Sequence, residues 1–546
     1  MYCDKPHINQ LTALLKGHGF EDIVVCPGSR NGALVHNFHA AQFRLHPVTD
    51  ERSAAFFALG LCLSTHRPVA LCVTSGSALL NTIPAVAEAY YRQLPLLVIS
   101  ADRPKEWINQ LDGQTLSQDG ALQPYAPTYT LGETSKKVEE NWYNLRMNEA
   151  LLSLLQNGGQ PIHINVPFSE PLFSFHTAKL PETRIIQEER TLTDQPFSEV
   201  MLQRIRNAQL PIIVMGQFEK GRLQDIEEIE HQGALLFLPE IITHQKYSWR
   251  TNALEHLLPN FEFAPDLVIH IGGNLVNKQL KLHLRRLDDC EVIRVEPGPQ
   301  MPDTFGHLTT IVRTSPEIAL RQLATIQAEK SSVREYQKKL DAYQVKARTY
   351  NPEKFSDLGV LQKFCEDLPK HSTFQIGNSS VIRNAAYFLD THNESLFCNR
   401  GVNGIEGSLS AAVGYATGNS AITYSLIGDL SFFYDQNALW NKELPKNLRI
   451  ILFNNGGGQI FYRLPGLDQT PALSPYIAAA HQTHAQGVAQ SYGLNYLAAH
   501  DYDELEKCLP VLRQEQSDCP ILLEVFTRKE DNETELKRIK QYYKTL

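Results

Sequence analysis

Short apolar runs rich in β-branched residues alternate with amphipathic stretches along most of the 546-residue chain. The runs are followed by glycine-containing turns, a rhythm typical of parallel sheets flanked by helices. It predicts an α/β fold of three tandem domains, each a mainly parallel sheet with flanking helices. The predicted strands are 22–26, 68–75, 95–100 and 161–167, then 211–216, 234–238, 266–272 and 290–296, then 372–377, 421–428, 449–454 and 520–526.

Two stretches interrupt this rhythm. Residues 169–200 are polar, with several prolines and no clear period, and residues 327–358 are highly charged and predict a solvated helix. We therefore expect domains at 1–185, 186–345 and 346–546.

The composition narrows the class of protein. Hydrophobic residues make up 42% of the chain and the net charge is -9, which argues against a nucleic-acid-binding surface. The nine cysteines are dispersed and form no C-x-x-C pair, as expected in a reducing compartment. No apolar run approaches the roughly 20 residues that span a bilayer. We expect a cytoplasmic protein with no nucleic-acid partner and no integral membrane association.

Polar residues follow two predicted strands of the third domain. Asp429 follows one, and Asn455 follows the next, with 432–444 as the predicted crossover helix. The loops after such strands share one edge of the sheet. Carboxylate and amide oxygens suit Mg²⁺, and the glycines at 456–458 let backbone N–H groups approach an anion. The pattern predicts a clamp for Mg²⁺ and a diphosphate, although a helix cap followed by a simple turn would also explain it.

The wider motifs resemble those of thiamine-diphosphate-dependent enzymes. The dipeptide Gly-Asp followed about 25 residues later by Asn-Asn is similar to the fingerprint of that superfamily. "NRGVNGIEGSLSAAVGYA", "GDLSFFYDQNAL" and "NNGGGQIFYRLP" resemble one branch, the 2-succinyl-5-enolpyruvyl-6-hydroxy-3-cyclohexene-1-carboxylate synthases (the MenD transferases of menaquinone biosynthesis, EC 2.2.1.9). "PGSRNGAL", "DERSAAFFALGLC", "TSGSA", "ADRP", "NVPFSEPL" and "GNSSVIR" extend the likeness over nearly the whole chain, most weakly in the middle domain.

This resemblance implies a thiamine-diphosphate-binding fold with thiamine diphosphate and Mg²⁺ (or Mn²⁺) as cofactors. The Asp429 and Asn455 side chains and the Gly457 carbonyl would hold the metal, and Ile405 would support the bent cofactor. Glu406 stands where the family often has Asp. The implied cofactor-binding residues are Glu51, Thr74, Ser75, Gly76, Ser379, Ile405, Gly428, Asp429, Leu430, Ser431, Asn455, Gly457, Gly458 and Ile460.

Glu51 has two explanations. A helix is predicted to begin near Asp50, and an acidic residue in its first turn would favour the helix dipole. The resemblance instead implies that Glu51 hydrogen-bonds the aminopyrimidine ring and promotes its activation, a task suited to a dry pocket that raises the carboxyl pKa. In this superfamily the acid and the metal site meet across a subunit interface, which implies a homodimer or homotetramer.

Arginines follow four predicted strands. Arg30 comes after a turn in which Gly28 permits the bend and Ser29 can cap a helix, and a capped turn with a solvated arginine would explain it equally. Four such positions in an acidic protein favour anion binding, because Arg donates two parallel hydrogen bonds to a carboxylate. The resemblance implies 2-oxoglutarate and isochorismate as substrates, with decarboxylation of the first and 1,4-addition to the second.

The implied catalytic residues are Glu51, Arg30 and Ser29, and the implied substrate contacts are Ser29, Arg30, Arg103, Gln114, Lys278, Arg383, Arg400, Phe461 and Leu464. Gln279 stands where the family often has Arg, which leaves the middle-domain contact open. For Ile460, Phe461 and Leu464, ordinary core packing explains the pattern almost as well.

Other functions are less well supported. A 2-oxo acid decarboxylase of this superfamily often has a His-His pair, which is absent, and an acetolactate synthase would add a flavin, for which 269–274 is too slight a signal. A non-catalytic nucleotide-binding protein would have no use for the ring-contacting acid. The chain lacks G-x-S-x-G, which disfavours a serine hydrolase. His481 and His484 have no further ligand cluster near them, so we expect a surface helix there rather than zinc.

Overall fold

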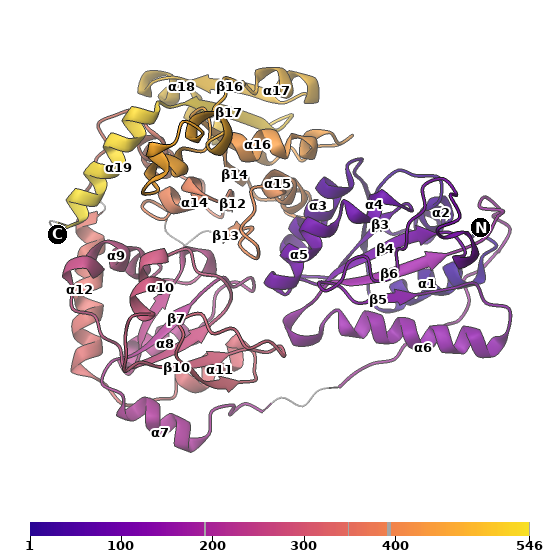
Figure 1. Cartoon of the computed structure of the whole chain (residues 1–546), viewed down its shortest axis with the longest axis horizontal. Helices are drawn as coiled ribbons and strands as arrows, with labels where there is room; N and C mark the ends of the chain where they lie inside the picture. Colours follow the sequence, from indigo (N-terminus) through magenta and orange to yellow (C-terminus); the bar gives the residue numbers. More distant parts are fainter. Residues whose placement is uncertain (190–192, 348, 390–394, 545–546) are drawn as a thin grey trace. The chain divides into compact units, whose positions relative to one another are not determined.

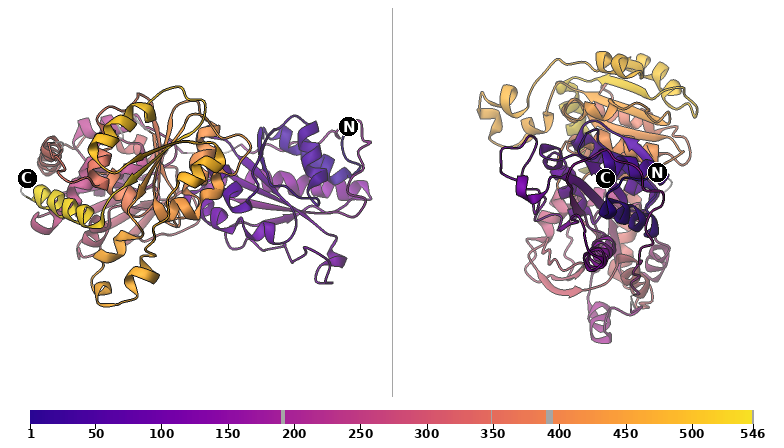
Figure 2. Two further views of the ribbon diagram at one scale, coloured as in Figure 1. Left: turned by 90° about the horizontal axis from the view of Figure 1, so that it is seen from above. Right: turned by 90° about the vertical axis from the view of Figure 1, so that its right-hand side faces the viewer.

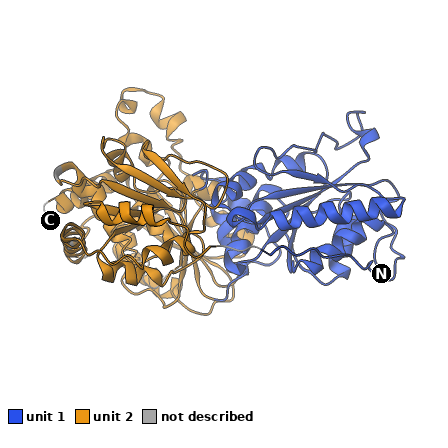
Figure 3. Ribbon diagram, turned by 90° about the horizontal axis from the view of Figure 1, so that it is seen from below, with its two compact units in different colours: residues 1–190, 401–420, 434–445 blue, residues 191–400, 421–433, 446–546 orange. Residues whose placement is uncertain are grey.

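The computed structural model describes residues 1–189, 193–347, 349–389 and 395–544. These form two compact units (Figure 3), unit 1 comprising 1–190, 401–420 and 434–445, and unit 2 comprising 191–400, 421–433 and 446–546. Unit 1 thus joins the first part of the chain to two segments from much later in it. The domain boundaries near 185 and 345 stay predictions.

Unit 1 is built on a six-stranded parallel sheet of order β2-β1-β3-β4-β6-β5. Its strands are β1 (Asp22–Val25), β2 (Arg44–Pro47), β3 (Val69–Val73), β4 (Leu96–Asp102), β5 (Thr128–Thr130) and β6 (Ile162–Pro167). Its helices are α1 (Pro6–Gly17), α2 (Gly32–Ala40), α3 (Glu51–Thr65), α4 (Ser77–Leu80), α5 (Ile83–Arg92), α6 (Lys137–Ser153) and α15 (Ser408–Thr417). Helices α1, α2 and α6 contribute to the core on one face, and α3 and α5 lie on the other (Figure 1).

Unit 2 contains two further parallel sheets (Figure 2). The first has the order β11-β10-β9-β7-β8. It comprises β7 (Pro211–Met215), β8 (Leu236–Pro239), β9 (Leu267–Ile271), β10 (Glu291–Val295) and β11 (Leu308–Val312), with α7 (Glu199–Asn207), α8 (Asp225–Gln232), α9 (Trp249–Leu257), α10 (Lys278–Leu284), α11 (Pro316–Leu323) and α12 (Ser331–Ala347). Helix α12 matches the solvated helix predicted within 327–358.

The other sheet of unit 2 has the order β13-β12-β14-β15-β17-β16. It comprises β12 (Thr373–Ile376), β13 (Ser395–Cys398), β14 (Thr423–Gly428), β15 (Leu448–Asn454), β16 (Asn495–Ala499) and β17 (Ile521–Phe526), with α13 (Asp357–Cys365), α14 (Ser380–Ala385), α16 (Asp429–Tyr434), α17 (Gln486–Tyr492), α18 (Tyr502–Leu512) and α19 (Lys529–Lys544). In the described part of the chain, no helix has both the length and the apolar character needed to cross a bilayer.

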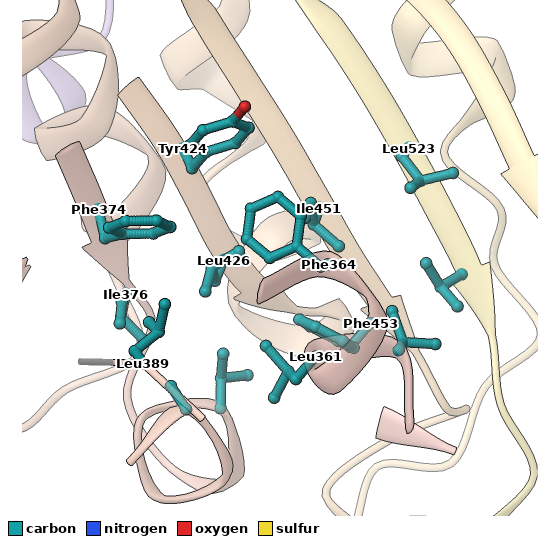
Figure 4. Packing of buried hydrophobic residues seen from close by; sticks show 14 of the residues in the cluster. Leu361, Phe364, Phe374, Ile376, Leu389, Tyr424, Leu426, Ile451, Phe453 and Leu523 are labelled. Carbon is teal, nitrogen blue, oxygen red and sulfur yellow. The ribbon is translucent and has the colours of Figure 1, made fainter. Parts of the chain in front are cut away.

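Aromatic packing fixes the strands that carry the predicted site. Phe364 of α13 packs edge-on against Tyr424 of β14 with ring centroids 4.9 Å apart, and Phe374 of β12 stacks on Tyr424 at 5.5 Å. Figure 4 shows these rings beside Ile451 and Phe453 of β15. This buried cluster holds β12, β14 and β15 in fixed register, because close-packed rings tolerate little displacement.

All twelve predicted strands are present, and every strand pair is parallel, as predicted. Five strands lie outside the twelve predicted ranges, namely β2, β5, β11, β13 and β16, and each lies at an edge of its sheet. Strands β2, β5, β11 and β16 are largely half-exposed, so they lack the continuous apolar run that marks a central parallel strand. Strand β13 is mostly buried but has only four residues.

The predicted helix over 432–444 is shorter than expected. Helix α16 ends at Tyr434 and is followed by the 3₁₀ turn η5 (Gln436–Leu439). Asp435 lies between them, and its buried carboxylate accepts hydrogen bonds from Ser410 N and Ser410 Oγ, both at 2.7 Å. The break therefore lets Asp435 satisfy the first turn of α15, and it ties 434–445 to that helix within unit 1.

Two glycines allow α15 to pack closely on α3. A Cβ at Gly60 of α3 would collide with the backbone carbonyl of Ala411, and a Cβ at Gly414 of α15 would collide with the carbonyl of Phe57. The contact is thus backbone against backbone, which only glycine permits.

We expect Gly60→Ala to lower the stability of unit 1 by about 1–3 kcal/mol, the usual cost of overpacking a close contact. The measurement is chemical denaturation followed by circular dichroism. Gly487→Ala in α17 is the matched control, because a Cβ there meets nothing within 4 Å. Equal unfolding midpoints for the two variants would contradict the close packing of α3 on α15.

Candidate functional site

The loops after β14 and β15 meet, as the sequence predicts. Gly428 pairs with Phe453 in the sheet, so both strands end at the same edge. The buried carboxylate of Asp429 accepts hydrogen bonds from Asn455 N at 3.1 Å and Gly457 N at 2.9 Å through Oδ2. Its Oδ1 accepts from Leu430 N at 2.6 Å. One carboxylate therefore holds both loops together.

The side chain of Asn455 offers a free oxygen. Its Nδ2 donates to Asp357 Oδ2 at 3.1 Å, which fixes the orientation of the amide because a carboxylate accepts hydrogen bonds. Asn455 Oδ1 is buried and has no hydrogen-bond partner among the described residues. A buried acceptor without a partner is costly, and a cation would satisfy it. The donor set of Asp429 and Asn455 thus fits a hard divalent cation.

The glycine loop, residues 456–458, lies beside Asp429 and Asn455. Gly457 has φ 133, and a Cβ there would lie 2.6 Å from Ala478 O, so only glycine fits. Its carbonyl accepts from Gln459 N at 2.9 Å and retains a second lone pair. Gly458 N donates to Ala478 O at 2.7 Å. Gly457 N donates to Asp429 Oδ2 at 2.9 Å, and the approach of this loop's N–H groups to an anionic ligand stays a prediction.

The other predicted cofactor residues of unit 2 lie on neighbouring elements of the same sheet. Gly428 ends β14, and Leu430 and Ser431 lie in the first turn of α16. Ser379 precedes α14 with φ 73, at the carboxyl end of β12. Of the apolar residues, Ile460 and Phe461 belong to the 3₁₀ turn η6 (Gln459–Arg463) and Leu464 follows it, 42% exposed.

Two predicted arginines of unit 1 lie near each other. The pKa of Arg30 is lowered by burial and then by the nearby positive charge of Arg103. Arg103 Nη1 donates to Ser75 Oγ and to Gln114 O, both at 3.2 Å, and its Nε lies 2.5 Å from Asp112 Oδ2. The charged form of Arg30, which burial and the neighbouring arginine disfavour, would be stabilised by a bound anion.

The backbone around these arginines is tightly arranged. Gln114 Nε2 donates to Ser75 O at 3.1 Å, and Ser75 Oγ donates to Gln114 O at 3.0 Å. Gly76 has φ 83 and donates from its N to Gln118 Oε1 at 2.7 Å. Thr74 Oγ1 is buried without a hydrogen-bond partner among the described residues. The predicted residues Thr74, Ser75, Gly76, Arg103 and Gln114 therefore form one cluster after β3 and β4.

The turn before α2 differs from expectation in one respect. Asn31, not Ser29, occupies the N-cap position, and Ser29 is exposed. The Asn31 side chain instead donates to Cys26 O at 2.9 Å, which holds the turn onto the end of β1. Gly28 allows a close approach, because a Cβ there would lie 2.5 Å from Thr74 Cβ.

Glu51 is the first residue of α3, as predicted. Asp50 is the N-cap and accepts from Ser53 N at 3.0 Å. The Glu51 side chain is half-buried, and its Oε2 accepts from Asn81 Nδ2 at 3.3 Å. Asp50 caps the helix, and Glu51 lies in its first turn, where a helix-dipole role also remains open. Ile405 lies in the 401–420 segment of unit 1 and is 37% exposed.

The predicted cations of unit 2 form a second basic group. Arg400 is buried and donates to Asn378 Oδ1 at 3.3 Å and to Leu275 O at 3.1 Å. Burial lowers the pKa of Arg383, and the charge of Arg400 lowers it further. Lys278, at the start of α10, is exposed. Neighbouring Lys281, which the motifs did not indicate, has its pKa lowered by burial and by the charges of Arg285, Arg400 and Lys278.

Two buried carboxyl groups that support this site were missed. Asp357, which orients Asn455, also accepts from Thr527 Oγ1 at 2.6 Å. Glu240, after β8, accepts from Asn277 N at 2.8 Å and so fixes the turn that leads into Lys278. In the sequence, Asp357 resembles an ordinary acidic residue of a helix first turn, and Glu240 follows an apolar run without any motif.

His481 lies in a different setting from the one predicted. Residues 478–485 are not helical, and α17 begins only at Gln486. The loop returns to the site, where His481 N donates to Gly456 O at 3.2 Å and His481 Nε2 lies 3.5 Å from Asp429 Oδ2. The absence of a side chain at Gly457 allows this loop to approach closely. The spacing of His481 and His484 in the sequence could not predict this contact.

Comparisons with known proteins identify the family of the chain. Residues 8–123 match the family model described as "Thiamine pyrophosphate enzyme, N-terminal TPP binding domain". The chain is 40% identical to the 2-succinyl-5-enolpyruvyl-6-hydroxy-3-cyclohexene-1-carboxylate synthase of Phocaeicola vulgatus, covering 100% of this chain and 99% of that protein. It is 39% identical to the synthase of the same name from Bacteroides thetaiotaomicron, with 100% of both covered.

Solved structures share the fold. A putative thiamin diphosphate-dependent enzyme isolated from Mycobacterium smegmatis superposes with a TM-score of 0.73 at 17% identity, over 96% of this chain and 100% of that one. Benzoylformate decarboxylase from Polynucleobacter necessarius gives a TM-score of 0.72 at 16% identity, over 97% of this chain and 99% of that one. These likenesses establish the predicted fold class.

We expect Glu240→Gln to change the pH dependence of stability. Burial raises the pKa of Glu240 to about 7 from an ordinary 4.5, so the folded state binds a proton more tightly than the unfolded state. The stability that this proton binding gives the folded state is present at low pH and is lost as the pH rises through about 7. The free energy of unfolding of Glu240→Gln should therefore rise relative to that of the wild type between pH 5 and 8, by up to about 3 kcal/mol.

Urea denaturation across that pH range measures this difference in the free energy of unfolding. Glu506→Gln, at an exposed position of α18, is the control and should track the wild type. A constant difference between Glu240→Gln and wild type would contradict a buried, proton-binding Glu240.

Proposed function

The chain belongs to the 2-succinyl-5-enolpyruvyl-6-hydroxy-3-cyclohexene-1-carboxylate synthase family, and from that premise we infer that it is a thiamine-diphosphate-dependent transferase of menaquinone biosynthesis. The reaction is the decarboxylation of 2-oxoglutarate and the 1,4-addition of the remaining four-carbon unit to isochorismate. The full-length match at 40% identity carries this proposal. The separate clusters of cations, suited to acidic substrates, support it.

We propose that Asp429, Asn455 and the Gly457 carbonyl hold Mg²⁺ or Mn²⁺. The unpartnered Asn455 Oδ1 beside the anchored Asp429 carboxylate supports this assignment. Thiamine diphosphate, when bound, supplies the electron sink for decarboxylation and the carbon that carries the four-carbon unit. The other cofactor contacts proposed are Thr74, Ser75, Gly76, Ser379, Ile405, Gly428, Leu430, Ser431, Gly458 and Ile460.

Acid–base chemistry is assigned to Glu51, whose carboxyl group would exchange a proton with the aminopyrimidine ring. Its freedom from the helix-capping task, which Asp50 performs, supports this role. Ser29 and Arg30 are proposed to act on the substrate beside it. A guanidinium group can hold a carboxylate in place through two parallel hydrogen bonds, which fixes the reacting atoms nearby.

Substrate carboxylates are assigned to the two basic groups. Arg30, Arg103 and Gln114 form the first, and Lys278, Arg383 and Arg400 the second, with Phe461 and Leu464 as an apolar wall. The lowered pKa values of Arg30 and Arg383, each beside another arginine, support anion binding at both places. We also propose a cytoplasmic homodimer or homotetramer in which Glu51 of one chain serves the metal site of another.

The activity is tested by incubating the protein with thiamine diphosphate, Mg²⁺, 2-oxoglutarate and isochorismate while following isochorismate absorbance. We expect the absorbance to fall only when 2-oxoglutarate is present. A fall without 2-oxoglutarate, or none with it, would reject the proposed reaction.

Replacement of Glu51, the proposed acid, should lower the rate of the chemical steps far more than it weakens substrate binding. Glu51→Gln is expected to lower kcat by about 10²–10⁴, the usual worth of one acid–base group, since the amide cannot exchange the proton. Steady-state kinetics provide the measurement, and Glu506→Gln is the control. Near-normal turnover of Glu51→Gln would refute the assignment.

Sharing of sites between chains can be tested by coexpressing Glu51→Gln with Asp429→Ala. If each site uses Glu51 of one chain and Asp429 of its partner, half of randomly formed dimers are mixed and each has one intact site. We then expect about a quarter of wild-type activity from two variants that are each inactive alone. No recovery in dimers shown to be mixed would contradict shared sites.

A further inference from the structure

His481 contacts the proposed metal site without belonging to its ligand set. Its side chain is directed at Asp429, with Nε2 3.5 Å from Oδ2. The ring lies edge-on to Phe433 of α16, with centroids 5.6 Å apart and planes at 87°. His481 Nε2 is buried and has no hydrogen-bond partner among the described residues. This nitrogen therefore lies beside a carboxylate that could accept a hydrogen bond from it.

The tautomer of this imidazole is settled by its other nitrogen. Nδ1 accepts a hydrogen bond from Thr483 N at 3.1 Å, so Nδ1 carries no proton and the ring proton resides on Nε2. The proton therefore faces Asp429. The backbone of the same residue donates to Gly456 O, which holds the ring at the glycine loop.

The two oxygens of Asp429 are surrounded unequally. Oδ2 accepts from Asn455 N and Gly457 N, and it is the oxygen nearest to His481. Oδ1 accepts from Leu430 N at 2.6 Å. Two backbone donors and the nearby His481 Nε2 thus lie on the Oδ2 side of the carboxylate and restrict its orientation. Outer donors of this kind orient metal-binding carboxylates and raise metal affinity.

We propose that His481 is a positioning residue for the divalent cation, holding the Asp429 carboxylate through Nε2–H in the orientation that binds metal. This role rests on the proposed function, since it requires the metal site at Asp429 and Asn455. His481 itself contributes no ligand to the cation. Asp357, which is buried, does the equivalent for Asn455, so each proposed side-chain ligand has an outer partner.

The test measures Mn²⁺ binding directly by electron paramagnetic resonance of the free ion, with thiamine diphosphate present and no substrate. His481→Phe keeps a ring against Phe433 but removes the donor, and we expect its Mn²⁺ dissociation constant to rise by about 10–100-fold. His481→Gln keeps an N–H donor near the position of Nε2 and should bind within a few-fold of wild type. His484→Phe is the matched control, since His484 is exposed, packs on Phe526 and has no contact with Asp429.

The outcomes separate this proposal from the one on which it rests. Absence of Mn²⁺ binding by the wild type would overturn the metal site and the role of His481 together. Wild-type binding with equal affinity in His481→Phe would overturn the role of His481 alone. A His481→Gln variant as weak as His481→Phe would also overturn it, because the effect would then follow from shape and not from the donor.

Discussion

The organisation of the candidate site depends on one buried carboxylate, that of Asp429. It accepts backbone hydrogen bonds from both ends of the Asn455–Gly457 turn, so the loops after β14 and β15 are fixed to each other. Hydrogen bonds to an ionised acceptor in a buried place are among the strongest in proteins. Removal of the carboxylate would leave two buried N–H groups without partners, which explains why the loop geometry and the chemistry depend on the same residue.

Polar residues surround this centre, of which Asp357 and Thr527 are buried and His481 is half-buried. Asp357 orients the Asn455 amide, Thr527 satisfies Asp357, and His481 faces Asp429. The same arrangement recurs at the basic group of unit 2, where Glu240 fixes the turn before Lys278. In both places a buried carboxyl group accepts hydrogen bonds from a backbone or side-chain amide. It thereby positions the neighbouring residue that is proposed to contact the ligand.

Unit 1 brings together parts of the chain that are far apart in sequence. Helix α15 packs on α3 through Gly60 and Gly414, and Asp435 binds the start of α15. Glu51 begins α3, so the proposed acid is positioned by a helix whose packing partner comes from the other end of the chain. Asn437 Nδ2 adds a hydrogen bond of 2.9 Å to Asp50 Oδ2, beside Glu51. Backbone contacts of this kind resist small displacements, since glycine leaves no side chain to adjust.

The sequence by itself determined the parallel α/β class, twelve of the strands and the meeting of Asp429 with Asn455. Central parallel strands are continuous apolar runs, and parallel strands end at a common edge, so local pattern sufficed. Only the tertiary structure decided the edge strands β2, β5, β11, β13 and β16. All of these except β13 lose that pattern because most of their residues are partly exposed. It also decided the place of His481 and the tasks of Asp357 and Glu240. These placements depend on contacts between segments that are distant in the sequence. Such contacts produce no periodic pattern of apolar and polar residues that could predict them.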